Sequence, residues 1–321
     1  SAGFFKTLLL RRLGSSIEAG KATISRLLSR ADLSSTDDAE DEDDAFFEDE
    51  AEERAFDDFT VDEVESLHRC IALLESSAED DPKLAEVFRY LLEGSGEHQT
   101  ATGPWLDRGC ILFSQYYDTA FWVGEKLARH PLMGTQIIGL YAGSGRSIIW
   151  ENGGHRRADR EEIKTMVAEG RMKILLGTDA ASEGLNLQRL GSLIHIDLPW
   201  NPTRLEQRKG RIQRIGQRYS DVWIANLRYR DSVEDRVHEL LSQRLEAIHG
   251  LFGQIPDTLE DVWIDMALGD KEEASRRIDQ ATSLKANPFD AKYSVVVDED
   301  WDSNPRVIDP IEAGEVMKKG W

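Results

Sequence analysis

Residues 173–202 decide the fold of this chain, and they read KILLGTDAASEGLNLQRLGSLIHIDLPWNP. The stretch holds two short apolar runs, at 173–177 and 192–196, and polar residues follow each of them. Apolar runs of this length, bounded by Gly, Asp and Pro, are typical of strands that are buried on both faces. Such strands usually belong to a parallel sheet, in which ligands bind at the carboxyl ends of the strands. The polar residues after each run are therefore the first candidates for chemistry.

The same alternation continues on both sides of this stretch, from residue 109 to residue 249. Further strands are expected at 111–113, 136–140 and 221–227, and helices at 117–129, 160–169, 202–214 and 232–249. Strands that alternate with helices in this way predict an α/β fold, with a parallel sheet covered by helices on both faces.

The helix expected at 202–214 has clear start and stop signals. Asn201 is a favourable N-cap, and Pro202 takes the first helical position, where its missing N–H costs nothing. Gly216 is a suitable stop at the other end. Three apolar residues share one stripe of this helix and should face the sheet: Leu205, Ile212 and Ile215.

A second stripe of the same helix is polar. Gln207, Arg211 and Arg214 follow one another at i, i+4 and i+7, and Gly210 beside them would let a ligand approach the backbone. Two guanidiniums one turn apart suit a polyphosphate, because each presents a planar fork of donors. The alternative is a solvated basic helix. The position of this helix, directly after a strand's carboxyl end, favours the ligand.

These segments resemble the motifs of a known family. Residues 207–217 resemble motif VI of superfamily 2 helicases of the Swi/Snf type, residues 178–188 resemble motif V, and residues 111–120 resemble motif IV. Residues 197–202 are similar to the segment that precedes motif VI in these enzymes. The resemblance implies a RecA-like lobe. A finer likeness, to large bacterial helicases of phage-defence systems such as DISARM, rests on residues 6–16, residues 139–146 and the C-terminal region.

The resemblance also implies roles for individual residues. Arg211 and Arg214 would neutralise charge on the γ-phosphate of ATP, and Gln207 would support them by hydrogen bonding. Glu183, Gly184 and Gly210 would lie near the nucleotide. Phosphates of one nucleic-acid strand, DNA or RNA, would be contacted by Ser114, Gln115, Thr178 and Asn186.

The resemblance covers only the second of the two lobes that such motors have. The first lobe carries a phosphate loop, G-x-x-x-x-G-K-[ST], and this chain contains no Gly-Lys-[Ser/Thr] sequence. We therefore expect ATP and Mg²⁺ to be held mainly by a first lobe absent from this chain, and the chain alone to be inactive. The complete enzyme would be an ATP-dependent helicase or translocase, with phage-defence proteins among its partners. The alternative is a nucleic-acid-binding or scaffold module that has lost motor activity.

Negative charge is concentrated in one part of the chain. The formal net charge is −21, but residues 31–65 hold 18 acidic residues and one basic residue, which leaves only −4 for the rest. Within this stretch, residues 31–58 predict a low-complexity acidic loop. It is either a solvating linker or a mimic of nucleic acid that covers a basic groove.

Composition also predicts the organisation of the 321 residues. We expect a helical lead-in with the acidic loop at 1–103, a RecA-like lobe at 104–250 and an extension, mostly helical, at 251–321. The two cysteines, Cys70 and Cys110, exclude a disulfide framework and favour a reducing compartment, so we expect a cytoplasmic protein. No apolar run is long enough to span a membrane, and the histidines have no metal-ligand spacing.

Overall fold

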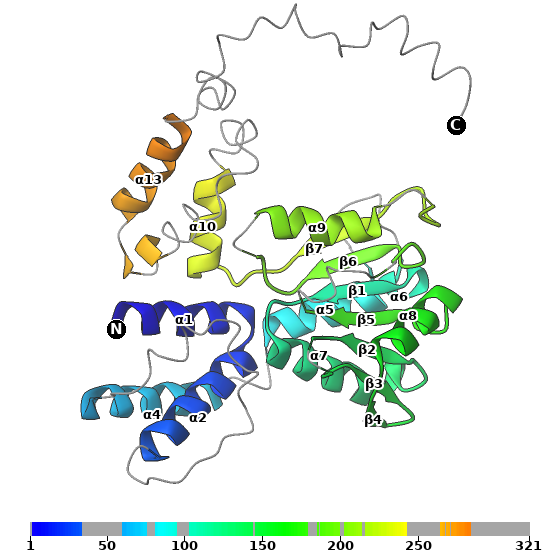
Figure 1. Ribbon diagram of the computed structural model, residues 1–321, viewed down its shortest axis with the longest axis horizontal. Coiled ribbons are helices and arrows are strands. Elements are labelled where there is room, and N and C mark those ends of the chain that lie inside the picture. The colour runs from blue at the N-terminus through cyan, green and yellow to red at the C-terminus, as the bar shows by residue number, and fades with distance from the viewer. Residues whose placement is uncertain are drawn as a thin grey trace, which may run out of the picture.

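A computed structural model describes residues 2–33, 60–75, 81–94, 103–143, 145–178, 185, 187–199, 202–213, 216–242, 264–266, 268–269 and 271–283. Its centre is a seven-stranded sheet with the order β4-β3-β2-β5-β1-β6-β7 (Figure 1). The strands are β1 (Cys110–Phe113), β2 (Ile138–Tyr141), β3 (Ile148–Glu151), β4 (Gly154–Arg157), β5 (Ile174–Gly177), β6 (Ser192–His195) and β7 (Trp223–Asn226).

Alternate residues of the central strands enter two separate cores, one on each face of the sheet. One core holds Leu112 and Leu176 with apolar residues of α5 (Pro82–Leu92), α6 (Trp105–Arg108) and α7 (Tyr117–Arg129). The other holds Ile111 and Leu175 with residues of α8 (Arg160–Glu169) and α9 (Pro202–Ile212). This three-layer arrangement confirms the predicted RecA-like α/β fold.

Five strands of the sheet run parallel, and one antiparallel hairpin extends its edge. Strands β2, β5, β1, β6 and β7 pair in parallel, whereas β3 and β4 form the hairpin next to β2. The alternation of strands and helices did not predict this hairpin. Its signal is the dipeptide Asn152-Gly153, whose φ angles of 52° and 79° suit a two-residue turn with positive φ at both central residues.

The helical lead-in lies against the carboxyl edge of the sheet. Three of its helices, α1 (Ala2–Ser15), α2 (Ile17–Leu33) and α4 (Val61–Glu75), share a small apolar core that includes Leu8, Leu27 and Leu67 (Figure 1). Residues 2–33 and 61–75 are thus largely helical, within the region where the sequence predicts a helical lead-in. The short 3-10 helix η3 (Pro131–Met133) follows α7.

After β7 the chain continues into α10 (Val233–Ser242) and later α13 (Lys271–Ser283). The helix expected at 232–249 is confirmed as far as residue 242, and its remainder lies outside the described residues. The same holds for residues 34–59, which include most of the acidic loop. The proposed domain boundaries stay a prediction, although α5, from the lead-in, packs into the core of the sheet.

Candidate functional site

The carboxyl ends of three neighbouring strands bring the predicted site segments together. Phe113 of β1 pairs in register with Gly177 of β5 and with His195 of β6. As a result Ser114, Thr178 and the Ile196–Asp197 segment follow side by side at one edge of the sheet. Segments that are about 20 to 80 residues apart in the chain thus share one edge, as their strand assignments predict.

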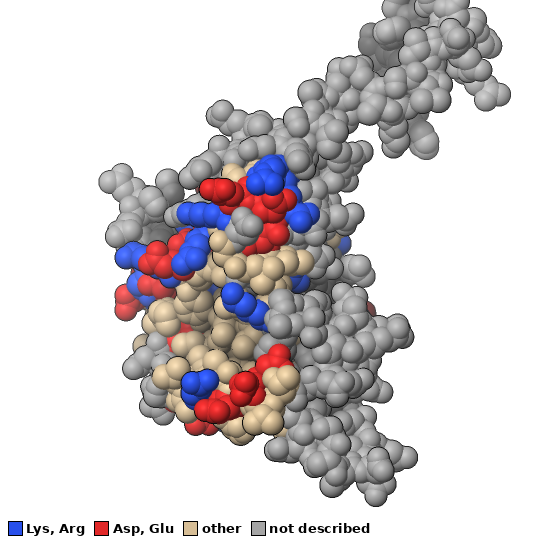
Figure 2. Space-filling view, turned by 90° about the vertical axis from the view of Figure 1, so that its left-hand side faces the viewer, with Lys and Arg blue, Asp and Glu red and all other residues tan. Residues whose placement is uncertain are grey.

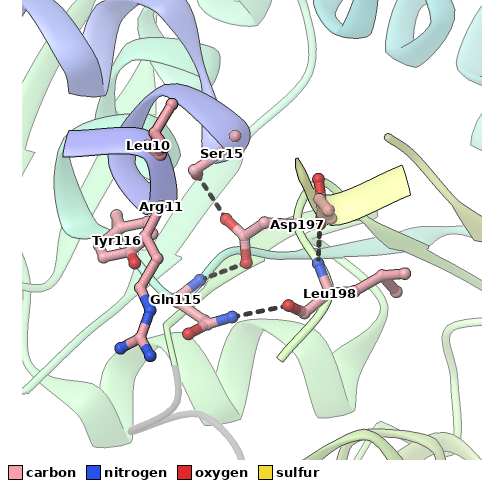
Figure 3. A pocket seen from close by; sticks show the side chains of 9 residues that line it. Leu10, Arg11, Ser15, Gln115, Tyr116, Asp197 and Leu198 are labelled. Carbon is pink, nitrogen blue, oxygen red and sulfur yellow. Dashed lines mark hydrogen bonds between the residues drawn. The ribbon is translucent and has the colours of Figure 1, made fainter. Parts of the chain in front are cut away.

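Asp197 is the centre of a buried hydrogen-bonding cluster at this edge (Figure 3). Its Oδ2 accepts from the hydroxyls of Ser114 and Ser15, each at 2.5 Å, and its Oδ1 accepts from the backbone N–H of Gln115 at 2.8 Å. Hydrogen bonds to a carboxylate are short and strong. Ser15 is the last residue of α1, so this cluster ties the lead-in to the sheet.

The structure therefore gives Ser114 and Thr178 different surroundings. Ser114 is fully buried, and its hydroxyl is engaged by Asp197. Thr178 is also mostly buried, but its hydroxyl has no hydrogen-bond partner among the residues that the structure describes, and only its backbone N–H is bonded, to Tyr141 O at 3.3 Å. A contact of either residue, or of Gln115, with nucleic acid stays a prediction.

The segment that leads from β6 to α9 is held from two sides (Figure 3). The side-chain amide of Gln115 donates to the carbonyl oxygen of Leu198 at 2.8 Å, and the backbone N–H of Leu198 donates to Glu234 at 2.9 Å. Gln115 follows β1, whereas Glu234 belongs to α10. The segment after β1 and helix α10 thus fix the backbone shortly before α9 begins.

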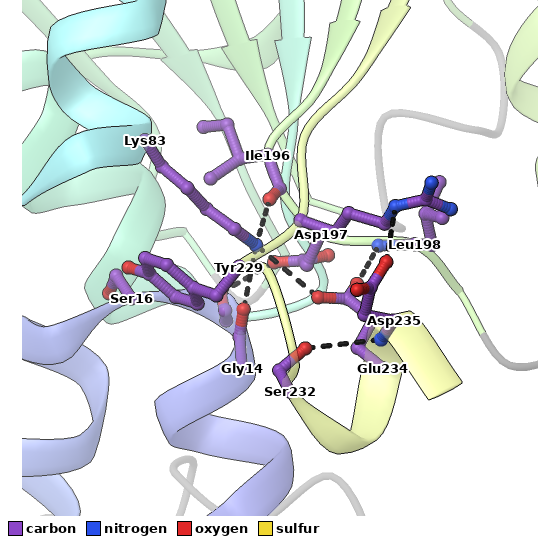
Figure 4. A network of polar contacts seen from close by, with 12 residues as sticks. Gly14, Ser16, Lys83, Ile196, Asp197, Leu198, Tyr229, Ser232, Glu234 and Asp235 are labelled. Atoms are coloured by element: carbon purple, nitrogen blue, oxygen red, sulfur yellow. Dashed lines mark hydrogen bonds and ion pairs between the residues drawn. The ribbon is translucent and has the colours of Figure 1, made fainter. Parts of the chain in front are cut away.

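Lys83 and Glu234 form a buried ion pair beside this segment (Figure 4). The Lys83 ammonium donates to the carbonyl oxygens of Gly14 and Ile196, each at 2.7 Å, and lies 3.4 Å from the Glu234 carboxylate. Both side chains are about 95% buried. One ammonium group therefore joins α5, the end of α1, β6 and α10.

Burial changes the acid–base properties of this network. It raises the pKa of Glu234 above its ordinary value, although the Lys83 charge and the Leu198 N–H act in the opposite direction. Burial and the neighbouring Asp81 likewise raise the pKa of Tyr229, whose hydroxyl donates to Asp81 at 2.7 Å. The sequence gives no signal for these pairs, because their members lie about 150 residues apart.

Helix α9 turns its predicted polar stripe away from the sheet. Gln207 is exposed and Arg211 is half-buried, and Arg211 has no ion pair with any residue that the structure describes. A Cβ atom added at Gly210 would meet nothing within 4 Å, so the backbone there is open to a ligand. Ile212, on the apolar stripe, is fully buried as predicted.

Arg208 occupies the buried side of α9, and the sequence analysis missed it. Its side chain is fully buried, its guanidinium carbon lies 5.2 Å from the centre of the Phe113 ring, and Nη1 is 3.4 Å from the carbonyl oxygen of Asp197. The signal was present, because Arg208 stands on the same helical stripe as Leu205 and Ile212. A buried guanidinium thus fixes the rotation of α9 on the sheet.

His195 lies next to this guanidinium, inside β6. Its Nδ1 is 3.5 Å from Arg208 Nη1, and its ring stacks 6.1 Å from that of Phe113. Burial lowers the pKa of His195 well below its ordinary value, and the positive charges of Arg208 and Lys209 add to this effect. His195 is therefore a neutral core residue, as its place inside a strand predicts.

The remaining predicted site residues lie outside the part of the chain that the structure describes. They are Glu183, Gly184, Asn186 and Arg214. Among the described residues no group of three or more His, Cys, Asp or Glu side chains could hold a metal ion. No helix within the described ranges is both long and apolar enough to cross a membrane.

The side of the molecule that carries α1 and α4 has mixed charge. Figure 2 shows basic and acidic side chains next to one another on the described part of this side, with uncharged residues between them. Opposite charges at short range offset one another. The described part of this face therefore offers no surface of a single sign to a polyanion.

Comparison with known proteins agrees with this geometry. Residues 107–216 match the family model "Helicase conserved C-terminal domain". The chain is 36% identical over 160 residues to an uncharacterized ATP-dependent helicase, YqhH, of Bacillus subtilis, a match that covers 50% of this chain and 26% of that protein. It is 38% identical over 101 residues to the RNA polymerase-associated protein RapA of Haemophilus influenzae, which covers 29% of this chain and 11% of RapA.

Among solved structures, the C-terminal part of the Fun30 ATPase domain is 18% identical, with a TM-score of 0.38, over 75% of this chain and 74% of that one. The chain spans about a quarter of the Bacillus helicase and about a ninth of RapA. Residues 107–216, about a third of the chain, are thus similar to the C-terminal domains of helicases.

Proposed function

We propose that this chain provides the second motor lobe of an ATP-dependent nucleic-acid helicase or translocase. The observation that carries the proposal is the orientation of α9. Buried Arg208 fixes the helix on the sheet, and Gln207, Gly210 and Arg211 lie on its accessible side. A guanidinium without an ion pair, beside an open glycine, is suited to bind the phosphates of a nucleotide held by a first lobe.

In this proposal the chain's own residues bind and orient charged groups. Arg211, together with Arg214, reaches the γ-phosphate and stabilises the negative charge that develops as it leaves, and Gln207 donates a hydrogen bond to the same group. Glu183, Gly184 and Gly210 lie near the nucleotide. The magnesium ion that neutralises phosphate charge is held by the first lobe.

The nucleic-acid backbone is contacted from the carboxyl edge of the sheet, by Thr178 and Asn186. Thr178 is suited to this because its hydroxyl is not engaged by a described residue. Ser114 and Gln115 stand at the same edge, and the Ser114 hydroxyl also donates to Asp197 and so helps to fix the segment that leads to α9. Phosphate contacts carry no sequence information, so movement along the strand tolerates any sequence and weakens at high salt. The motif sequences favour an enzyme of the Swi/Snf type that acts in phage defence.

The test is ATP turnover by the two-lobed protein, with this chain joined to its first lobe. Arg211→Ala should lower turnover by about 10³-fold or more, and Arg214→Ala should act similarly, while affinity for nucleic acid stays nearly unchanged. The matched control is Arg171→Ala, because Arg171 is exposed and paired with Glu169 at 2.6 Å. This control should keep full turnover.

Two results would contradict the proposal. The first is loss of nucleic-acid affinity in Arg211→Ala with turnover intact. The second is turnover by the 321-residue chain alone that Arg211→Ala abolishes. Binding of nucleic acid without any turnover in the two-lobed protein would favour a scaffold module that has lost motor activity.

A further inference from the structure

A second charged site lies at the opposite edge of the sheet, where the strands begin. Four basic side chains and one aromatic ring line a cavity of about 290 Å³ there; this basic pocket consists of Arg108, Lys173, Arg189, Arg218 and Tyr219. It is formed by the end of α6, the turn after α8 and the segments that precede β6 and β7. In Figure 1 these elements lie at the end of the sheet away from α1.

The cations of the basic pocket lack acidic partners among the described residues, in contrast to several other arginines of this lobe. Arg129, Arg156 and Arg171 each form an ion pair with a glutamate. No residue that the structure describes forms an ion pair with any cation of the basic pocket, and the one carboxylate in its lining is that of Asp107. In a chain with a net charge of −21, unpaired cations that line one cavity indicate an anionic ligand.

Two members of the basic pocket, Arg108 and Tyr219, are held in place by packing. The centre of the Tyr219 ring is 4.5 Å from the guanidinium carbon of Arg108 and 5.9 Å from that of Arg218. The ring sits directly over Gly191, where an added Cβ atom would be only 2.7 Å from it. The Arg108 guanidinium is further fixed by the Trp223 ring at 4.1 Å and by a hydrogen bond to the carbonyl oxygen of Asp221.

One N–H donor of Arg108 nevertheless remains unsatisfied. Its Nε is buried and has no hydrogen-bond partner among the described residues. Leaving a buried donor unsatisfied usually costs about 1–3 kcal/mol, and a ligand oxygen would remove that cost. Preformed, fixed donors also bind a ligand without a large loss of side-chain entropy.

We propose that the basic pocket binds a phosphate group of a nucleic-acid strand. A phosphate offers several oxygens around one centre, which matches guanidinium and ammonium donors that converge on a small cavity. A second hollow, lined by Gln188, Arg189, Gly216 and Arg218, shares two of these arginines. The two hollows together give room for a polymer that continues past the bound phosphate, which favours a strand over a free ion.

The site is separate from the proposed motor contacts and involves no ATP. It can therefore be tested on the 321-residue chain without nucleotide, by fluorescence anisotropy of a labelled single-stranded oligonucleotide at several salt concentrations. The double variant Lys173→Ala/Arg189→Ala should bind about tenfold more weakly or worse. Its plot of log affinity against log salt should be shallower by about 1 for each phosphate that the variant no longer binds.

The matched control is Arg129→Ala/Arg156→Ala, which removes the same charge from exposed arginines that are paired with glutamates and lie outside the pocket. It should leave the salt slope unchanged. Equal loss in both variants, or no loss in the pocket variant, would overturn the proposal. All four side chains are exposed, and circular dichroism should show the same thermal unfolding for each protein.

Three competitors identify the source of the phosphate. Unlabelled oligonucleotide should displace the labelled strand from the parent chain much better than from the pocket variant, whereas inorganic pyrophosphate and poly-glutamate should displace it poorly. Strong displacement by pyrophosphate would overturn the assignment to a strand, and strong displacement by poly-glutamate would overturn the assignment to phosphate. Because no ATP is present, either result leaves the motor proposal untouched, and failure of the Arg211→Ala test leaves this one untouched.

Discussion

Arg208 and Arg211 stand three residues apart on one helix and have different tasks. Arg208 is buried against Phe113 and the backbone of Asp197, whereas Arg211 is half-buried and has no ion pair with a described residue. A buried arginine contributes the packing of its long stem as well as its charge. We therefore expect Arg208 to contribute mainly to stability and Arg211 mainly to catalysis.

Arg208→Ala should lower the free energy of unfolding by about 3 kcal/mol, since it leaves a cavity and unpaired backbone acceptors. Arg211→Ala should lower it by less than about 1 kcal/mol, because that side chain is only half-buried. Urea denaturation followed by circular dichroism measures both values. Similar losses in the two variants would show that Arg208 does not anchor α9.

His195 makes stability depend on pH below neutrality. Its pKa in the folded chain lies well below 6.5, so the unfolded chain takes up a proton first as the pH falls. The contribution of neutral His195 to the free energy of unfolding is therefore fully present well above pH 6.5 and is lost as the pH decreases below that value. Between pH 6.5 and 5.5 the loss should reach at most about 1.0 kcal/mol, because the unfolded chain is already half protonated at pH 6.5.

The measurement is chemical denaturation at these two pH values for the parent chain and for His195→Gln. The variant should lose less stability on acidification, whatever its absolute stability. His155→Gln is the control, since His155 is exposed on β4. If His195→Gln kept the slope of the parent chain, His195 would be charged in the folded state.

Helices α1, α5 and α10 are held on the carboxyl edge of the sheet by polar contacts as well as by packing. The Lys83 ammonium donates to the carbonyl oxygens of Gly14 in α1 and of Ile196 after β6, and it pairs with Glu234 of α10 (Figure 4). Taking two charges out of water is costly, and the cost is offset only while both partners are present. The pair therefore specifies how these elements assemble.

Lys83→Met should destabilise the chain by about 3–5 kcal/mol, because it leaves the Glu234 carboxylate buried without a counter-charge. Adding Glu234→Gln should recover part of this loss, since a neutral amide oxygen can still accept from Leu198 N–H. Thermal and urea unfolding of the two single variants and the double variant gives the coupling energy. A coupling energy near zero would mean that the two side chains do not interact.

The lead-in and the sheet with its flanking helices are joined by a shared apolar core and by polar contacts. Leu84, Val87 and Leu91 of α5 belong to the same buried core as β1, β5 and α7. Ser15 of α1 reaches the Asp197 cluster. A division of the chain at residue 103, as composition predicts, would cut through that core.

Two shortened chains test this directly. Residues 81–250 keep α5 and should unfold in one cooperative transition, although less stably than the full chain. Residues 104–250 expose the apolar surface that α5 covers, so they should unfold broadly or aggregate. Differential scanning calorimetry and analytical ultracentrifugation distinguish the two; a sharp transition for residues 104–250 would show that the composition boundary is the physical one.

The local pattern of the sequence predicted most of the sheet and its helices, because strand and helix periodicity is a property of neighbouring residues. It also located the carboxyl edge, since polar residues follow the strands at 174–177 and 192–195. It missed the β3–β4 hairpin, although Asn152-Gly153 marks the turn, because the alternation around it is weak. It also missed that Arg208 stands on the apolar stripe of α9, because a guanidinium is seldom fully buried.

Only the tertiary structure decided what closes the carboxyl edge. Ser15, Lys83, Asp197 and Glu234 come from four elements that lie up to about 220 residues apart, and no local pattern links them. The same is true of the basic pocket, where Arg108, Lys173 and Arg218 precede three different strands. Sequence periodicity determines which residues face a core, whereas the pairing of buried charges depends on which elements the fold places next to one another.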